Sequence, residues 1–162
     1  GLGDVYKRQN EYGVNAPFYN MEDGSVMTVF RYKEQHQSYP GRVHGGMITA
    51  MLDEMGLRSL WAKELSEETF GVTISLDTKY RKPVPYETEL IGRGVVVKNT
   101  SHFIITDSYI MDKDGEILAN GRIKYIKMDT QKIQEGVEVH EEMPYLVEDG
   151  RTEIEGPFFD NL

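Results

Sequence analysis

The chain has no cysteine among its 162 residues. This absence excludes disulfide bonds, a thiol nucleophile and thiolate metal ligands, and it is compatible with a reducing compartment, so we expect a cytoplasmic protein. No run of about 18 apolar residues occurs, and the N-terminus lacks the apolar stretch of a secretory signal. The sequence therefore predicts one globular domain without a membrane span or a signal peptide.

Positive charge is scarce, and the excess of negative charge is concentrated at one end. The net charge is −9, and residues 129–162 contribute −8 of it, with ten acidic and two basic residues. The rest of the chain is therefore close to neutral. Because nucleic-acid binding needs a cationic surface, this distribution argues against a nucleic-acid-binding protein. We expect 129–162 to be an acidic C-terminal tail that follows the folded domain.

The histidines are too dispersed for a metal site. A zinc site normally draws on ligands at short, regular spacings. The four histidines show no such spacing: they are His36, His44, His102 and His140. We therefore expect a protein that uses neither a metal nor an organic cofactor.

One long helix and a series of strands dominate the periodic pattern. A nearly continuous apolar stretch predicts a buried helix over about 45–63, whose second half gains charges and emerges to solvent. In the strand predicted over 70–80, alternation places Val72, Ile74 and Leu76 on the face opposite Thr73. The other predicted strands span 25–33, 87–99, 102–111 and 116–128, with a hairpin turn at 112–115.

This order of elements indicates the fold class. One long helix followed by consecutive antiparallel strands is an α+β layout, and the economical packing is a sheet curled around the helix. The folded domain is predicted to span 21–128. Residues 1–20 form an N-terminal extension, whose first nine residues fit no periodic pattern.

The stretch 44–54, which reads HGGMITAMLDE, holds the most informative chemistry. Gly45 and Gly46 open the helix, where backbone N–H groups without partners are what an oxyanion needs. Nine residues after His44, Asp53 places a carboxylate in an apolar helix, where a charge is costly unless it is paired or used. Together these features indicate an enzyme that attacks a carbonyl group.

The stretch 37–128 resembles the hotdog-fold acyl-CoA thioesterases of the PaaI-like group, relatives of 4-hydroxybenzoyl-CoA thioesterase. Three features carry the resemblance: a Tyr-Pro-Gly turn at 39–41 before the His-Gly-Gly of 44–46, Asp53 at the position of the catalytic carboxylate, and the Tyr-Arg-Lys-Pro of 80–83. The resemblance implies hydrolysis of an acyl-CoA thioester to a free acid and CoA. It also implies a homodimer, often paired into a homotetramer, with the active site at the dimer interface.

For the catalytic groups, the resemblance implies that Asp53 either attacks the thioester carbonyl or activates water as a general base. Glu54 is its rival, but adjacent helical residues lie about 100° apart, so only one of the two points at a given site. The Gly45 N–H, with Gly46 beside it, would polarise the thioester oxygen, while His44 orients the loop. The nine residues from His44 to Asp53 span about 13 Å of helix, so Asp53 and the Gly45 N–H of one chain cannot act on the same carbonyl. The resemblance resolves this with a site shared by two subunits.

Further residues complete the predicted site. Thr73 stands where the family often has a hydroxyl, which would hold the nucleophilic water or orient Asp53. Ser38 stands where some relatives carry Asn, and Gln37 or His36 is near enough to replace it. The CoA phosphates would meet a basic cluster formed by Lys79, Arg81 and Lys82. The acyl chain would lie against apolar side chains at the interface: Met47, Met51, Met55 and Leu60.

Two alternative functions share the fold. A hotdog dehydratase acting on an acyl-CoA or an acyl-carrier protein usually pairs a His with a carboxylate in a different local motif. A non-catalytic acyl-CoA-binding protein would keep the pocket, and the short Ser38 is compatible with it. The sequence leaves open the acyl chain, the choice between CoA and acyl-carrier protein, and whether Asp53 is nucleophile or general base.

Overall fold

The computed structural model describes residues 13–62 and 69–129. Residues 1–9 and the predicted tail from 130 onward lie outside this part of the chain. The described elements are β1 (Phe18–Asn20), β2 (Val26–Phe30), the 3-10 helix η1 (Glu34–His36), α2 (Gly45–Ala62), β3 (Thr69–Tyr80), β4 (Leu90–Asn99), β5 (Phe103–Met111) and β6 (Ile117–Asp129). Within these residues no helix is long and apolar enough to cross a membrane.

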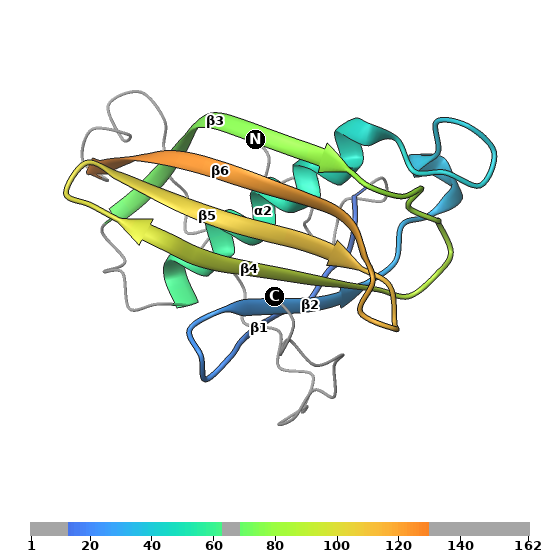
Figure 1. Ribbon diagram of the computed structural model, residues 1–162, viewed down its shortest axis with the longest axis horizontal. Coiled ribbons are helices and arrows are strands. Elements are labelled where there is room, and N and C mark those ends of the chain that lie inside the picture. Colours follow the sequence, from blue (N-terminus) through green and yellow to red (C-terminus); the bar gives the residue numbers. More distant parts are fainter. Residues whose placement is uncertain (1–12, 63–68, 130–162) are drawn as a thin grey trace.

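The six strands form an antiparallel sheet in the order β1-β2-β4-β5-β6-β3. The helix α2 packs on all six strands, and the sheet curls around it (Figure 1). The predicted α+β hotdog fold, an antiparallel sheet wrapped around one long helix, is therefore confirmed. The two edges of the sheet differ greatly in length, because β1 has 3 residues and β3 has 12.

The helix is anchored on β4, in the middle of the sheet. Met51, Leu52 and Met55 of α2 are completely buried. Gly94 of β4 lies so close to the helix that a Cβ there would come within 2.3 Å of the Met55 backbone oxygen. Because only glycine fits at this position, the spacing between α2 and β4 is set by backbone rather than by side chains.

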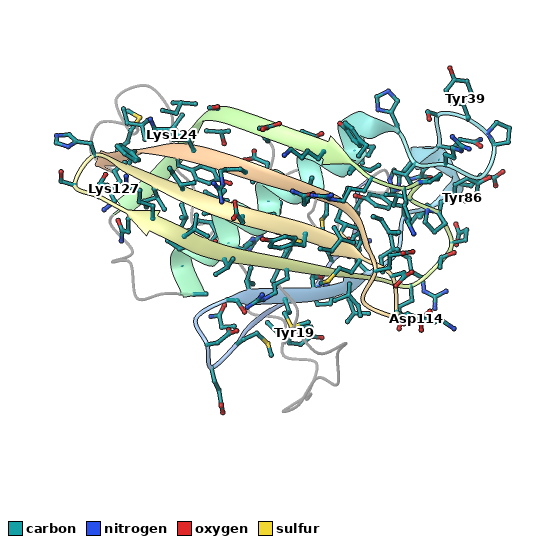
Figure 2. All side chains as sticks on the ribbon, in the orientation of Figure 1. Tyr19, Tyr39, Tyr86, Asp114, Lys124 and Lys127 are labelled. Atoms are coloured by element: carbon teal, nitrogen blue, oxygen red, sulfur yellow. The ribbon has the colours of Figure 1, made fainter. Side chains whose placement is uncertain are left out.

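The two ends of the molecule present different side chains. Tyr39 and Tyr86 lie at the end where the chain enters α2, whereas Lys124 and Lys127 lie at the opposite end (Figure 2). The loop before α2 contacts the loop between β3 and β4, because the Gly41 N–H donates to the Tyr86 hydroxyl at 3.2 Å.

The domain boundary expected at residue 21 falls inside the packed body. Val14 is only 1% exposed and belongs to the main core cluster. β1 pairs with β2 through Phe18 opposite Thr28. The part of the predicted extension that the structure describes, residues 13–20, is therefore part of the domain. A three-residue strand is too short to produce an alternating pattern that could have shown this.

The alternation predicted for β3 fails within the strand. The register against β6 shifts between Thr73 and Ser75, which marks a β-bulge. A bulge places an extra residue in one strand and reverses the alternation after it. Val72 and Ile74 are 41% and 53% exposed, whereas Leu76, predicted on the same face, packs against the core on the side where Thr73 reaches Asp53.

The predicted burial of α2 also needs correction. The first half is not buried all round, since Gly46 is exposed and Met47 and Asp53 are half-buried. The second half does not emerge to solvent, since Glu54 and Leu60 are buried. The reason is the sheet edge: one side of α2 lies beside β3, where the sheet ends, and the other side is covered by β1, β2 and β4.

Candidate active site

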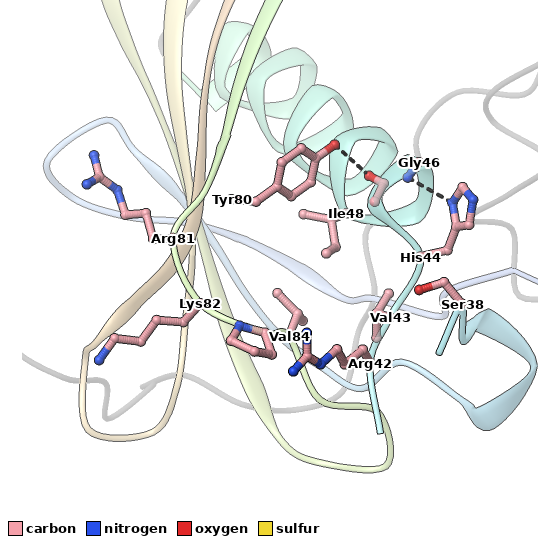
Figure 3. A pocket seen from close by; sticks show the side chains of 12 residues that line it. Ser38, Arg42, Val43, His44, Gly46, Ile48, Tyr80, Arg81, Lys82 and Val84 are labelled. Atoms are coloured by element: carbon pink, nitrogen blue, oxygen red, sulfur yellow. Dashed lines mark hydrogen bonds between the residues drawn. The ribbon is translucent and has the colours of Figure 1, made fainter. Parts of the chain in front are cut away.

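The start of α2 is organised by His44. The His44 N–H donates to the His36 carbonyl oxygen at 2.8 Å, and the His44 carbonyl accepts the Met47 N–H at 3.0 Å. The Gly46 N–H donates to His44 Nδ1 at 2.9 Å, so this imidazole caps the helix (Figure 3). Because Nδ1 accepts a hydrogen bond, the neutral ring carries its proton on Nε2. His44 is thus a helix-start residue, as predicted.

This cap leaves one backbone donor available. The Gly46 N–H is occupied by His44, whereas the Gly45 N–H has no hydrogen-bond partner within the described part of the chain. Gly45 is half-buried at the positive end of the helix dipole. An anion or a polarised carbonyl oxygen is the natural partner for such a donor.

Tyr80, at the end of β3, covers the helix start. Its hydroxyl donates to the Gly45 carbonyl at 3.0 Å and lies 2.7 Å from the Thr49 hydroxyl. A Cβ on Gly45 would approach the Tyr80 ring within 3.2–3.4 Å, so the two residues are in close contact. The ring is nevertheless 57% exposed. A ligand that reaches the Gly45 N–H therefore passes an exposed aromatic surface.

A pocket of about 610 Å³ opens beside this helix start. Its lining includes six of the predicted site residues: Ser38, His44, Gly45, Gly46, Arg81 and Lys82. Arg81 and Lys82 lie across the pocket from Ser38 and His44 (Figure 3). Tyr80 also lines it, whereas Lys79, Met47, Met51, Met55 and Leu60 do not.

The cations of this pocket differ in their partners. Lys82 is paired with Glu116, and Arg81 Nε donates to the Asn120 side chain at 2.6 Å. Arg42, which no sequence pattern singled out, also lines the pocket, and its guanidinium has no ion-pair partner among the described residues. Its proximity to His44, two positions later, is the only signal that could have suggested it.

Asp53 lies on the side of α2 that faces the β3 edge. Its carboxylate accepts the Thr73 hydroxyl at 3.0 Å on Oδ1 and 3.3 Å on Oδ2. The Tyr125 hydroxyl, from β6, lies 3.0 Å from Oδ1 and 2.9 Å from the Asp53 backbone oxygen. Burial raises the pKa of Asp53 above its usual value, and the hydrogen bonds from Thr73 and Tyr125 partly oppose this. The result is a half-buried carboxylate with two hydroxyl donors.

Glu54 is placed differently. It is 6% exposed, and its Oε1 accepts the Arg58 Nε–H at 2.7 Å. The Arg58 guanidinium in turn lies 5.0 Å from the centre of the Phe18 ring. Glu54 is therefore a paired structural residue on the β1 side of the helix, and the structure does not bring it to the pocket.

The two predicted catalytic elements lie apart along α2. Gly45 and Asp53 are eight residues apart on one helix, a separation of about 12 Å along the axis. Thr73 hydrogen-bonds to Asp53 near the middle of the helix, and Tyr80 hydrogen-bonds to Gly45 at the helix start. Within the described residues there is no group of three or more His, Asp or Glu side chains that could hold a metal ion.

The sequence of the chain matches a known protein family. Residues 40–119, about half of the chain, match the profile of the Thioesterase superfamily. The chain belongs to this superfamily. The matched stretch includes the helix start, Asp53 and Thr73.

Individual thioesterases are similar over 61–75% of the chain. The chain is 23% identical to acyl-coenzyme A thioesterase 13 of Homo sapiens over 100 residues, which cover 61% of this chain and 70% of that protein. A solved thioesterase superfamily protein has a TM-score of 0.70 at 24% identity, over 75% of this chain and 61% of that one, less than two thirds of its length. A hypothetical thioesterase of Streptococcus pneumoniae, solved with coenzyme A, has a TM-score of 0.63 at 20% identity, over 71% of this chain and 87% of that one. The two solved structures bear on the fold of the chain.

Proposed function

We propose that the protein hydrolyses an acyl-CoA thioester to a free acid and CoA. The observation that carries this proposal is the state of Asp53 in a thioesterase superfamily fold: a half-buried carboxylate that faces the open sheet edge and accepts two hydroxyl hydrogen bonds. Desolvation makes such a carboxylate a stronger base than a solvated one. The similarity to an acyl-coenzyme A thioesterase supports the choice of substrate class.

The Gly45 N–H would polarise the thioester carbonyl. In the general-base route, Asp53 removes a proton from water while the water oxygen bonds to the carbonyl carbon. The negative charge that develops on the carbonyl oxygen meets the Gly45 N–H and the helix dipole. The carbon–sulfur bond then breaks, and the proton passes to the CoA thiolate. In the nucleophilic route, Asp53 itself attacks the carbon, CoA leaves, and water hydrolyses the resulting anhydride.

Both routes need two copies of the chain, because Gly45 and Asp53 of one chain are too far apart. The long edge strand β3 offers a pairing surface, with apolar Val72 and Ile74 exposed on it. An antiparallel pairing of β3 with β3 of a second copy, about a twofold axis between Thr73 and Tyr80, would bring these two positions opposite each other. Thr73 contacts Asp53, and Tyr80 contacts Gly45. The Asp53 of each copy would therefore meet the Gly45 of the other copy across the interface.

The pocket beside the helix start would receive the CoA moiety. The phosphate groups of CoA are anionic, and Arg42, Arg81 and Lys82 place cations along this pocket. Of these, Lys82 is paired with Glu116 and Arg81 is held by the neutral Asn120 side chain, whereas Arg42 has no ion-pair partner in the described residues. The acyl group would extend along the open side of α2, past the half-buried Met47.

A mixed-dimer experiment tests the shared site. Gly45→Pro removes the N–H at the first helical position, where proline is tolerated, and Asp53→Asn removes the base. Each homodimer should have lost about 100-fold or more of CoA release. Dimers that combine one chain of each kind, isolated with two affinity tags, should regain activity, because one of their two sites holds an intact Asp53 and an intact Gly45.

Restoration in the mixed dimer supports the shared site, and wild-type homodimers mixed in the same way give the upper limit. An inactive mixed dimer would place both groups in one chain and contradict the proposal. A wild-type protein that binds CoA esters but releases no thiol would instead be an acyl-CoA-binding protein. A product with changed absorbance but no free thiol would indicate a dehydratase.

A further inference from the structure

A buried tyrosine, Tyr125, contacts the proposed catalytic carboxylate of Asp53. Tyr125 lies on β6, is 0% exposed, and is separated from Asp53 by 72 residues of sequence. Its hydroxyl is 3.0 Å from Asp53 Oδ1 and 2.9 Å from the Asp53 backbone oxygen. The phenol therefore contacts the reactive residue at both its side chain and its main chain.

The helix carries an opening for this hydroxyl. Gly56, one turn after Asp53, lies where a Cβ would come within 2.4 Å of the Tyr125 hydroxyl and 2.6 Å of the Thr106 hydroxyl. No larger residue could stand there without moving the phenol away. Gly71 on β3 similarly leaves room for the ring, since a Cβ there would lie 3.1 Å from Tyr125 Cβ. The close contact of the phenol with Asp53 thus depends on two glycines.

Tyr125 can act only as a hydrogen-bond donor to the carboxylate. Burial, followed by the negative charge of Asp53, raises the pKa of the Tyr125 phenol far above its usual value. The phenol is therefore protonated at neutral pH. Its single proton is within reach of Oδ1 and of the backbone oxygen.

We propose that Tyr125 is a positioning residue for Asp53: its hydroxyl, with that of Thr73, fixes Oδ1 and leaves Oδ2 as the oxygen that receives the proton or attacks. Oδ1 lies 3.0 Å from both hydroxyls, whereas Oδ2 has the longer 3.3 Å contact with Thr73. The inference rests on the proposed function, because it assigns the two oxygens of the same base.

The surroundings of Asp53 contain few other charges. From α2 itself comes Glu54, which is paired with Arg58. β6 contributes the neutral phenol of Tyr125, and β3 contributes the hydroxyl of Thr73. β5 contributes the hydroxyls of Thr106 and Ser108, which lie beside Gly56. Among the described residues, Tyr125 and Thr73 are thus the groups whose removal most directly changes the ionisation of Asp53.

Tyr125→Phe keeps the ring and removes the donor. We expect kcat to fall about 10- to 100-fold with little change in KM, because the base is misplaced while the binding pocket is intact. We also expect the acid limb of the kcat/KM profile to move to higher pH, because the ionised carboxylate has lost a donor. The matched control is Tyr32→Phe, since Tyr32 is also 0% exposed and its hydroxyl donates to the α2 backbone at Met47. The control should keep the wild-type acid limb.

A second variant displaces the hydroxyl without removing it. Gly56→Ala should reproduce the pH shift of Tyr125→Phe. Its control is Gly121→Ala on β6, where a Cβ would meet Leu52 at an ordinary 3.4 Å. If folded Tyr125→Phe keeps the wild-type acid limb of the kcat/KM profile, the proposal is overturned. The Tyr125 hydroxyl would then serve only as a donor to the Asp53 backbone oxygen.

A readout without turnover separates this proposal from the proposed function. The carboxyl carbon of Asp53, assigned by comparison with Asp53→Asn, can be titrated by NMR in wild type and in Tyr125→Phe. A titration that moves to higher pH in Tyr125→Phe supports the positioning role even if the wild type hydrolyses no thioester. An identical titration in both proteins overturns it.

Discussion

Asp53 and Glu54 are neighbours in the sequence, yet the fold gives these two carboxylates opposite surroundings. Glu54 lies on the closed side of α2, buried and held by the Arg58 guanidinium at 2.7 Å. Asp53 lies on the open side beside the β3 edge, where its described partners are the hydroxyls of Thr73 and Tyr125. The Arg58 guanidinium occupies the Glu54 carboxylate, whereas Asp53 has only neutral donors and faces the open edge. The position of the sheet edge therefore decides which acid is available for chemistry.

Asparagine at position 53 tests this comparison most severely. Asp53→Asn keeps the shape and removes the base, so turnover should fall at least about 100-fold. Free CoA can be followed with a thiol reagent, and the absence of cysteine in the chain keeps the background low. Glu54→Gln, the same change one residue later, should keep turnover close to wild type. Equal losses in the two variants would contradict the assignment.

Lysine at position 74 tests the open edge. Ile74 is 53% exposed on β3, and a charge on an unpaired edge strand opposes pairing with another strand. We expect Ile74→Lys to weaken dimerisation at least about 10-fold, with activity lost in proportion. Sedimentation equilibrium measures this, and Val97→Lys on β4, where Val97 is 47% exposed, serves as the control. A monomer with full activity would exclude a site shared by two subunits.

Removing the Thr73 hydroxyl, which contacts Asp53 on the open side of α2, should lower turnover less. Thr73→Val keeps the shape, and we expect about a 10-fold loss of kcat, the modest end for a lost positioning contact. Asp53 must be ionised to act as base, so kcat/KM falls as the pH drops through its raised pKa. Loss of the Thr73 donor raises that pKa further and moves the acid limb to higher pH. Ser75→Ala, on the same strand, should leave the profile unchanged, and a common shift in both variants would argue against a specific role.

The closed side should respond in stability rather than in activity. Glu54→Gln breaks a buried, charge-assisted hydrogen bond, so the free energy of unfolding should drop by about 1.5–3 kcal/mol. Asp53→Asn should cause no loss, because the raised pKa of Asp53 means that its ionised form destabilises the folded state at neutral pH. Urea unfolding at neutral pH measures both. A larger loss in Asp53→Asn than in Glu54→Gln would reverse the comparison.

The helix and the hairpin turn could be predicted because their signals are local. The apolar stretch from Gly45 predicted a helix over 45–63, and α2 spans Gly45–Ala62. The predicted hairpin turn is also confirmed, since Asp112 Oδ1 accepts the backbone N–H groups of Asp114 and Glu116, both at 2.9 Å. Turn chemistry and helix periodicity operate within a few residues, so they can be recognised in one sequence.

The lateral contacts of the site could not be predicted in this way. Alternation grouped Leu76 with Val72 and Ile74, and this grouping fails because a β-bulge is a property of the pairing of two strands. The contact between Tyr125 and Asp53 spans 72 residues and has no spacing signal. The spacing of Glu54 and Arg58 within α2 is a local signal, but the contact of Arg58 with Phe18 involves β1, which was not predicted. The catalytic roles, the dimer or tetramer, and the cytoplasmic location stay predictions.

The contact between Gly94 and the Met55 backbone limits how this protein can be re-engineered or can diverge. Because the backbones of α2 and β4 are already in close contact at Gly94, the helix cannot move closer to the sheet there. Changes in acyl-group preference must then come from side chains that line the open side, such as Met47 and Ala50, and not from moving the helix. Libraries built at those two positions would explore new substrates, whereas libraries on the anchored face would mainly yield unfolded chains.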